Sequence, residues 1–426
     1  MTGDAGEHGA PIAARAAATW VARRLRDAGH RALFAGGCVR DQLLGLEPAD
    51  YDVATDALPD QVRAVFPRAI GVGESFGVML VRHGGRTVEV ATFRADGSYA
   101  DGRRPDGVRF SDDREDALRR DFTINGLFED PETGAVIDHV GGRADLDARI
   151  LRAIGDPDAR LAEDRLRALR AVRFAARFAL AVDPATEAAV RRVAHDLRAV
   201  SRERVGHELR RMLAHPSRAR AVSLVESMGL VPAILSGPAP PPETRARPSV
   251  VAALPAGAPF EEALAAWMID RSAGGAIPVS EVRGRVNAWR RALSLSNDET
   301  EALRAALELR AVIPSRWPAG DRAARKRLAA APGFGAARAL LAAEGHPVAE
   351  AVARDLPALV AEGVAPRPFV DGDDLVAAGL APGPRFKAIL DALYDRQLNL
   401  EFPDRDHALR ALAAPGGPLG EGARDR

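Results

Sequence analysis

Two carboxylates and a glycine pair, close together between residues 31 and 56, constrain this chain more than any other feature of its sequence. A short apolar run leads into Gly36 and Gly37, Arg40 follows, and Asp50 and Asp52 come after a further apolar stretch. Alternate residues of a strand point to the same face, so Asp50 and Asp52 would lie side by side on a strand. An isolated Asp-x-Asp is usually a solvated turn, but here a glycine turn with an arginine precedes it. The segment predicts a site for a divalent metal and a phosphate.

Four further motifs follow in the chain: VEVATFR at 88–94, RRDFTIN at 119–125, EDRLR at 163–167 and ERVGHE at 203–208. In this order, the five segments strongly resemble the signature of the nucleotidyltransferase superfamily branch that contains bacterial CCA-adding enzymes and poly(A) polymerases. The resemblance covers the N-terminal half of the chain well and the C-terminal half only in patches.

The resemblance implies an α/β nucleotidyltransferase head, with a small mixed sheet and flanking helices, followed by an all-α neck, body and tail. It implies template-independent addition of CMP and AMP to the 3′-end of tRNA, with CTP, ATP and Mg²⁺. Poly(A) polymerase and enzymes that add only A or only CC remain alternatives, and the loop at 93–110 is more like that of the CCA-adding members. A catalytically inactive RNA-binding protein is a further alternative, which the complete set of motif residues disfavours.

The composition is that of a globular protein, with 47% apolar and 28% charged residues in a chain of 426. This length suggests two to four subdomains. No stretch is apolar enough for a membrane span, and the N-terminus lacks an export pattern, so we expect no membrane association. A lone cysteine, Cys38, fits a reducing cytoplasm and predicts a small buried side chain rather than a nucleophile.

Turn and helix signals divide the chain into six segments. They are a disordered N-terminus at 1–10, a head at 11–155, a helical neck that binds RNA and nucleotide at 156–236, a Pro-rich linker at 237–249, a helical body at 250–362, and a helical tail at 363–426. Within them we predict strands at 33–35, 51–54, 78–81 and 87–92, a helix starting after Pro59, a hairpin turn at 130–134, and helices at 11–28, 117–128, 162–178, 184–198 and 202–213.

The residue types suit nucleotidyl transfer. Asp50 and Asp52 are the predicted metal ligands, because Mg²⁺ prefers oxygen donors and takes one or two carboxylates. The resemblance adds Glu89 as the third catalytic carboxylate, for which the alternative is a surface acid at a strand edge. Gly36 and Gly37 would let the backbone approach a triphosphate closely, and Arg40 would donate to its oxygens.

The nucleotide itself is expected to meet two further groups. Arg120 and Asp121 resemble the ribose-contacting pair of the family, and Asn125 lies one helical turn beyond Asp121. Asp164 and Arg167, three apart on a predicted helix, are either an ordinary ion pair or the base-reading pair. A carboxylate facing an exocyclic amine and a guanidinium facing a ring nitrogen would accept cytosine and adenine and reject uracil and guanine. The resemblance adds, as nucleotide contacts, Arg170, Arg173 and, more weakly, Arg177.

The RNA partner is predicted from charge. The chain has no net charge, yet residues 160–220 hold fifteen arginines against seven acids. Such a local surplus is the footprint of a nucleic-acid track. We take Arg210 and Arg211 as its representatives, and Glu203, Arg204 and Glu208 as structural ion-pairing residues. In the tail, Arg385 and Lys387 follow a Pro-Gly turn at a helix start, which either binds a backbone phosphate or is a plain packing unit. No protein partner is indicated.

Overall fold

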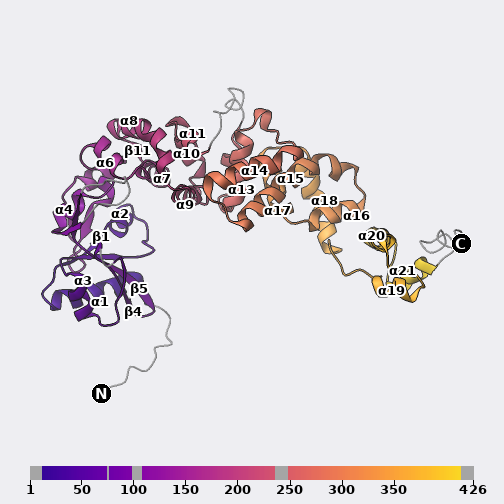
Figure 1. Cartoon of the computed structure of the whole chain (residues 1–426), viewed down its shortest axis with the longest axis horizontal. Helices are drawn as coiled ribbons and strands as arrows, with labels where there is room; N and C mark the ends of the chain where they lie inside the picture. Colours follow the sequence, from indigo (N-terminus) through magenta and orange to yellow (C-terminus); the bar gives the residue numbers. More distant parts are fainter. Residues whose placement is uncertain (1–11, 74–75, 98–107, 236–247, 414–426) are drawn as a thin grey trace, which may run out of the picture. The chain divides into compact units, whose positions relative to one another are not determined.

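The computed structural model describes residues 12–73, 76–97, 108–235 and 248–413. The predicted disordered N-terminus, most of the predicted linker and the centre of the predicted loop at 93–110 therefore lie outside the described residues. The chain divides into two compact units, residues 1–212 with 220–236 and residues 213–219 with 237–426. Figure 1 shows strands in the first part of the chain and helices in the remainder.

A seven-stranded mixed sheet forms the core of the first unit. Its order is β3 (Ile70–Gly73), β4 (Val78–His83), β5 (Arg86–Thr92), β2 (Asp52–Thr55), β1 (Ala32–Ala35), β8 (Leu127–Glu129) and β9 (Val136–Asp138). Strands β2 and β5 pair in parallel and the other neighbours pair antiparallel. The prediction of a small mixed sheet is confirmed, and the four predicted strands correspond to β1, β2, β4 and β5.

Short helices flank this sheet: α1 (Ala14–Asp27), α2 (Gly37–Leu43), α3 (Pro59–Val65), α4 (Asp113–Leu118) and α5 (Gly142–Asp147). Helix α1 buries a stripe at three- and four-residue spacing, Ala17, Ala18, Val21, Ala22 and Leu25, as an amphipathic helix on a core does. Helix α3 starts with Pro59 as predicted. Strands β8 and β9 are joined by the predicted turn, where Gly134 has a φ of +70°.

The predicted helix at 117–128 is wrong. Helix α4 starts earlier, because the side chain of Asp112 caps it by accepting from the backbone N–H of Glu115, and it ends at Leu118. A 3₁₀ turn, Thr123–Asn125, follows, and Phe128 then pairs with Ala35 in the sheet. Short apolar runs do not distinguish helix from strand by their spacing, and here the sheet pairing decides.

Beyond residue 156 the described part of the first unit is helical except for the short strand β11 (Ala181–Val182), which pairs in parallel with β10 (Ile150–Leu151). Its helices are α6 (Pro157–Glu163), α7 (Arg167–Arg177), α8 (Pro184–Val193), α9 (Arg202–Leu213), α10 (Arg218–Ser227) and α11 (Val231–Ile234). The single helix predicted at 162–178 is wrong, because the chain breaks between α6 and α7. Asp164 is extended there, with φ −146° and ψ 104°, and its carboxylate accepts from the N–H of Leu166 at 3.1 Å.

The described part of the second unit is helical throughout, as predicted for the body and tail. Its helices are α12 (Val250–Ala253), α13 (Phe260–Asp270), α14 (Val279–Leu293), α15 (Asn297–Ala319), α16 (Arg322–Ala330), α17 (Phe334–Ala343), α18 (Val348–Ala361), α19 (Gly372–Ala377), α20 (Pro384–Leu398) and α21 (Arg405–Ala413). Among the helices of the described residues, none combines the length and apolar character that crossing a bilayer requires.

Two separate apolar clusters lie in this unit. One packs α15, α17 and α18 around Trp317 and Phe334, and the other packs the tail around Leu375, Leu393 and Phe402. Polar contacts of α16 link the two. Arg327 donates to Asp395 at 2.5 Å on α20, and Asn399 exchanges hydrogen bonds with the start of α16. The clusters are thus joined through a junction of ion pairs and hydrogen bonds, which we call the α16–α20 junction.

Arg218 is the most deeply buried arginine that the structure describes, at 1% exposure. Its guanidinium donates to four backbone carbonyls, those of Leu213, Pro255, Ala256 and Ala258, at 2.6 to 3.2 Å. We expect Arg218→Met to lower the free energy of unfolding by about 3 kcal/mol, because it leaves buried carbonyls without donors. Urea unfolding followed by circular dichroism measures this. The exposed Arg316→Met on α15 is the control, with an expected change within about 0.5 kcal/mol.

Candidate active site

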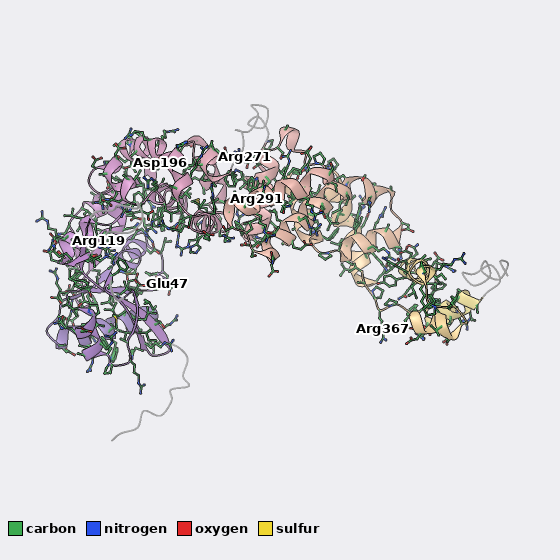
Figure 2. The ribbon with its side chains drawn as sticks, viewed as in Figure 1. Glu47, Arg119, Asp196, Arg271, Arg291 and Arg367 are labelled. Atoms are coloured by element: carbon green, nitrogen blue, oxygen red, sulfur yellow. The ribbon has the colours of Figure 1, made fainter. Side chains whose placement is uncertain are left out.

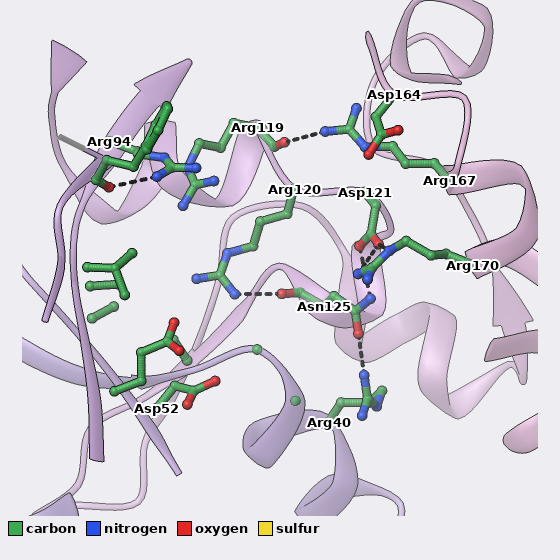
Figure 3. A pocket seen from close by; sticks show the side chains of 18 of the residues that line it. Arg40, Asp52, Arg94, Arg119, Arg120, Asp121, Asn125, Asp164, Arg167 and Arg170 are labelled. Atoms are coloured by element: carbon green, nitrogen blue, oxygen red, sulfur yellow. Dashed lines mark hydrogen bonds and ion pairs between the residues drawn. The ribbon is translucent and has the colours of Figure 1, made fainter. Parts of the chain in front are cut away.

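A cavity of about 660 Å³ opens in the first unit, between the sheet and helices α7 and α9. Figure 3 shows Asp52 at one side of it and Asp164 with Arg167 at the other, with Arg120, Asp121 and Asn125 between them. Among the described residues, eight arginines and four acidic residues line the cavity. This surplus of positive charge suits a polyanionic ligand. The structure therefore brings the motifs of the first half of the chain together around one space.

Two carboxylates stand next to each other on the cavity floor. Asp52 and Glu89 immediately precede Val53 and Val90, which pair in register between the parallel strands β2 and β5, and both side chains line the cavity. Burial, together with the negative charges of Glu89 and Asp50, raises the pKa of Asp52 to about 7, although the positive charge of Arg120 acts to lower it. Burial and Asp50 also raise the pKa of Glu89. The carboxylates thus lack a full positive counterpart.

Asp50 is placed differently from its predicted partner. It precedes β2, which begins at Asp52, and it is exposed. It does not line the main cavity but a smaller one of about 330 Å³, together with Tyr51 and Arg86. Its charge nevertheless acts on both Asp52 and Glu89. Within the described ranges, no three His, Cys, Asp or Glu side chains stand close enough to hold a metal by themselves.

The glycine turn lies at the cavity wall. Gly36 has a φ of +70°, which strains any residue with a side chain, and a Cβ there would also lie 2.6 Å from Nη1 of Arg120, which would have to move. Arg40 lines the cavity too but is buried, and its guanidinium donates to Asp41 and to the side chain of Asn125. It also lies over the ring of Phe178, 4.4 Å from the centroid. These contacts make Arg40 part of the wall rather than a free donor.

Asn125 forms hydrogen bonds with three of the predicted nucleotide contacts (Figure 3). Its side chain accepts from Arg40 and donates to Asp121 at 2.9 Å, and its carbonyl accepts from Arg120 at 3.0 Å. Asp121 in turn binds Arg170 through two nitrogens at 2.6 and 2.7 Å. Although burial alone would raise the pKa of Asp121, Arg170 and Asn125 hold it at about 2. Asp121 and Asn125 thus meet as predicted, across a turn rather than on an α-helix.

Asp164 and Arg167 both line the cavity, but they form no ion pair with each other. Asp164 accepts from Arg204 at 2.6 Å, whereas Arg167 donates to Glu163 and to the carbonyl of Arg160. The prediction of an ordinary intrahelical ion pair between Asp164 and Arg167 is therefore wrong, because the chain breaks between α6 and α7 and each side chain binds another partner. Their base-reading role stays a prediction.

Other predicted residues lie outside the cavity. Arg173 is buried against Glu208, with Nε 2.6 Å from the carboxylate, and does not line the cavity. Neither does Arg210, whereas its neighbour Arg211 does. Arg385 and Lys387 are exposed in the first turn of α20, in the second unit. Figure 2 shows charged side chains spread along both units, with Arg119 labelled near the cavity and Arg367 at the start of the tail.

Cys38 is buried next to the cavity wall. Its thiol donates to the carbonyl of Ala35, and burial raises its pKa to about 12. A thiol with this pKa is protonated and unreactive at neutral pH. The prediction of a small buried side chain is confirmed.

Sequence reasoning missed several residues of the lining. Arg204 was expected to be only structural, yet it holds Asp164 in the cavity. Arg94 and Arg119 line the cavity and lie inside recognised motifs, but no role was predicted for them from the sequence. Phe174, one residue after Arg173, also lines the cavity and was missed. Helical spacing from Arg167 and Arg170 would have placed Phe174 on their face, since 167, 170 and 174 share one side of a helix.

Comparison with known proteins assigns the family. A model described as the poly A polymerase head domain matches residues 32–152, and one described as a probable RNA and SrmB-binding site of polymerase A matches residues 179–242. A CCA-adding enzyme of Geobacillus kaustophilus is 34% identical over 402 residues, which cover 92% of this chain and 94% of the relative. The chain belongs to the CCA-adding enzyme family.

Other members of the CCA-adding enzyme family resemble the chain over different lengths. The enzyme of Geobacillus thermodenitrificans is 45% identical over 213 residues, and this match spans about half of each protein, 49% of the chain and 52% of the relative. A crystal structure of the Bacillus stearothermophilus CCA-adding enzyme in complex with CTP superposes with a TM-score of 0.74 at 31% identity, covering 92% of this chain and 95% of that one. The predicted family and the predicted fold class are confirmed.

Proposed function

We propose that the protein adds CMP and AMP to the 3′-end of tRNA without a nucleic-acid template, using CTP and ATP and releasing pyrophosphate. The observation that carries this is the single cavity that joins the paired carboxylates Asp52 and Glu89 to Asp164 and Arg167. A nucleotide bound in this cavity would place its α-phosphate at the carboxylates and its base at Asp164 and Arg167. The relatives named CCA-adding enzymes, one of them in complex with CTP, support this substrate class.

The carboxylates fit Mg²⁺. Two adjacent acids with raised pKa values lack a cation, and a divalent ion with oxygen ligands is the group that relieves this. We assign Asp52 and Asp50 as ligands and Glu89 as the third carboxylate. When bound, such ions lower the pKa of a hydroxyl nucleophile and neutralise developing charge on the leaving oxygens. Asp50 is exposed before β2, so its side chain is free to turn towards Asp52.

The remaining residues hold the nucleotide. Gly36 and Gly37 have no side chains, so a triphosphate can approach their backbone closely. Arg120 faces the same space. Asp121 is saturated by Phe122, Asn125 and Arg170, so we assign it to orienting Arg170 and Asn125 rather than to a direct grip on the ribose. Arg40 and Arg173 hold the wall from behind, through Asp41 and Glu208.

The product formed on defined RNA ends tests the function. Transcripts of one tRNA that end before CCA, after C, after CC and after CCA are incubated with each labelled nucleoside triphosphate. We expect C on the first two, A on the third and nothing on the complete end. Long A tracts on every end would identify a poly(A) polymerase, and a stop after CC or activity only on CC ends would identify a partial enzyme. The absence of any incorporation would contradict the proposal.

We further propose that the head, neck, body and tail predicted from the sequence are separate functional segments, with tRNA bound along the neck and tail. The exposed Arg385 and Lys387 of α20 support the tail contact. We also propose that the protein acts in the cytoplasm. A buried, protonated Cys38 is compatible with a reducing compartment.

The affinity for tRNA should fall steeply with salt, because each neutralised phosphate releases condensed counterions. We expect Arg385→Glu combined with Lys387→Glu to weaken binding and to flatten the plot of log affinity against log salt by on the order of one to two units. Fluorescence anisotropy with labelled tRNA at several salt concentrations measures both. The paired reversal of Arg354 and Arg290, exposed arginines of the body, is the control. An unchanged slope in the tail variant would remove the tail from the tRNA site.

A further inference from the structure

One face of α9 presents three charged residues to the nucleotide cavity and its wall. Arg204, Glu208 and Arg211 are spaced four and three apart, so they lie on one side of the helix. Arg204 binds Asp164 at 2.6 Å, and Glu208 binds Arg173 at 2.6 Å. Arg211 is exposed and lines the cavity, and within the part of the chain that the structure describes no hydrogen bond or ion pair holds its side chain.

The other cavity arginines that reach an acid have an ion-pair partner. Arg40 binds Asp41, Arg119 and Arg120 share Asp116, Arg167 binds Glu163, Arg170 binds Asp121 and Arg204 binds Asp164. The positive charge of Arg211 instead acts on its neighbour Arg173. Burial lowers the pKa of Arg173, Glu208 opposes this, and the like charges of Arg170 and Arg211 lower that pKa again. The positive charge of Arg211 therefore has no protein counterpart in the described residues, although it borders a site for anions.

We propose that Arg211 binds a phosphate of the substrate. The inference rests on the proposed function, in which two phosphate sources reach the cavity: the triphosphate of the incoming nucleotide and the last phosphodiesters of the RNA. Position favours the RNA. Arg211 shares the α9 face with Arg204, which holds Asp164, whereas the reacting α-phosphate must reach Asp52 on the opposite side of the cavity (Figure 3). The last phosphodiester of the RNA does not react and need not approach Asp52, so the side of the cavity near Asp164 is open to it.

Steady-state kinetics with each substrate varied in turn separates the two sources. For Arg211→Ala we expect the KM for tRNA lacking its terminal A to rise about tenfold while the KM for ATP stays unchanged, since one charge-assisted contact is lost. The salt slope of RNA binding should fall by about 0.7, the value for one phosphate contact on a single strand. Arg211→Lys should recover part of the loss, because an ammonium replaces the charge but not the fork of donors.

Arg23→Ala is the matched control. It removes an exposed arginine from α1 of the same unit, outside the cavity and outside the arginine-rich segment 160–220, and both KM values should stay unchanged. A rise in the KM for ATP alone would identify the triphosphate as the source and keep Arg211 as a phosphate contact. Unchanged KM values and an unchanged salt slope in Arg211→Ala would overturn the inference. In that case the wild-type protein would still add nucleotides, whereas failure of the proposed function would appear as no incorporation by the wild type.

Discussion

Asp52→Asn should abolish nucleotide incorporation, lowering kcat by roughly three orders of magnitude, while tRNA affinity is kept. The reason is that Asp52 is the partly buried carboxylate on β2, beside Glu89 of β5, and the assigned metal ligand. Metal-stabilised charge in a transition state is worth several kcal/mol. Single-turnover incorporation of labelled CTP measures the rate, and anisotropy measures RNA binding. Asp60→Asn, which removes an acid that is 93% exposed on α3, is the control.

The same variant should not be less stable than the wild type. Because the pKa of Asp52 is raised from 3.8 to about 7, the folded protein holds a proton that the unfolded chain releases, and stability falls as the pH rises from about 4 to 7. Asn cannot ionise and lacks this loss. In metal-free buffer at pH 8 we therefore expect Asp52→Asn to have a Tm equal to or above that of the wild type. A large drop in Tm would mean that the lost activity reflects unfolding, and substantial turnover in Mg²⁺ would end the metal assignment.

Asp164→Ala should remove base selectivity as well as rate. If Asp164 accepts from the exocyclic amine of cytosine or adenine, incorporation of CTP and ATP falls together, while UTP and GTP lose less. A bidentate base contact is worth about 1 to 3 kcal/mol, so the ratio of C plus A over U plus G should drop on the order of tenfold to a hundredfold. Single-nucleotide incorporation with each of the four triphosphates gives this ratio.

Two variants separate base reading from folding. Arg204→Leu removes the partner that holds Asp164 but leaves the carboxylate, so it should lower the rate while most of the selectivity remains. Asp158→Ala removes an exposed acid paired with Arg192 and should change neither. If the ratio stays intact in Asp164→Ala while Tm falls, then Asp164 is a structural partner of Arg204, and the account of specificity fails while the enzyme class stands.

The sequence predicted the parts of this protein whose signals are local. The strands β1, β2, β4 and β5 and the start of α3 at Pro59 follow from apolar runs and turn residues that act within a few positions. The motif residues around Gly36, Asp52 and Asp121 were placed in one site because their types and order carry the chemistry. Cys38 was correctly predicted to be buried, because it directly follows the glycine pair, where a small side chain is expected.

The errors arose where partners distant in the chain decide the structure. Residues 127–129 became a strand because β1, about 90 residues earlier, offers an edge for pairing, which the local period cannot reveal. Asp164 follows the end of α6 and binds Arg204, 40 residues away, rather than its neighbour Arg167. Arg40 was predicted to donate to triphosphate oxygens, yet its guanidinium donates to Asn125 and lies over the rings of Phe174 in α7 and of Phe178 just after it. Pairing among many arginines is a tertiary property.

The α16–α20 junction gives the tail an independence that the rest of the second unit lacks. The named polar contacts of Arg327, Asp395 and Asn399 between the two apolar clusters are ion pairs and hydrogen bonds, which water can replace when the clusters separate. A tail attached in this way can be exchanged, shortened or lengthened in evolution without repacking the helices that carry it. Under the proposal that the tail contacts tRNA, selection on RNA recognition can therefore act on the tail while leaving the first unit untouched.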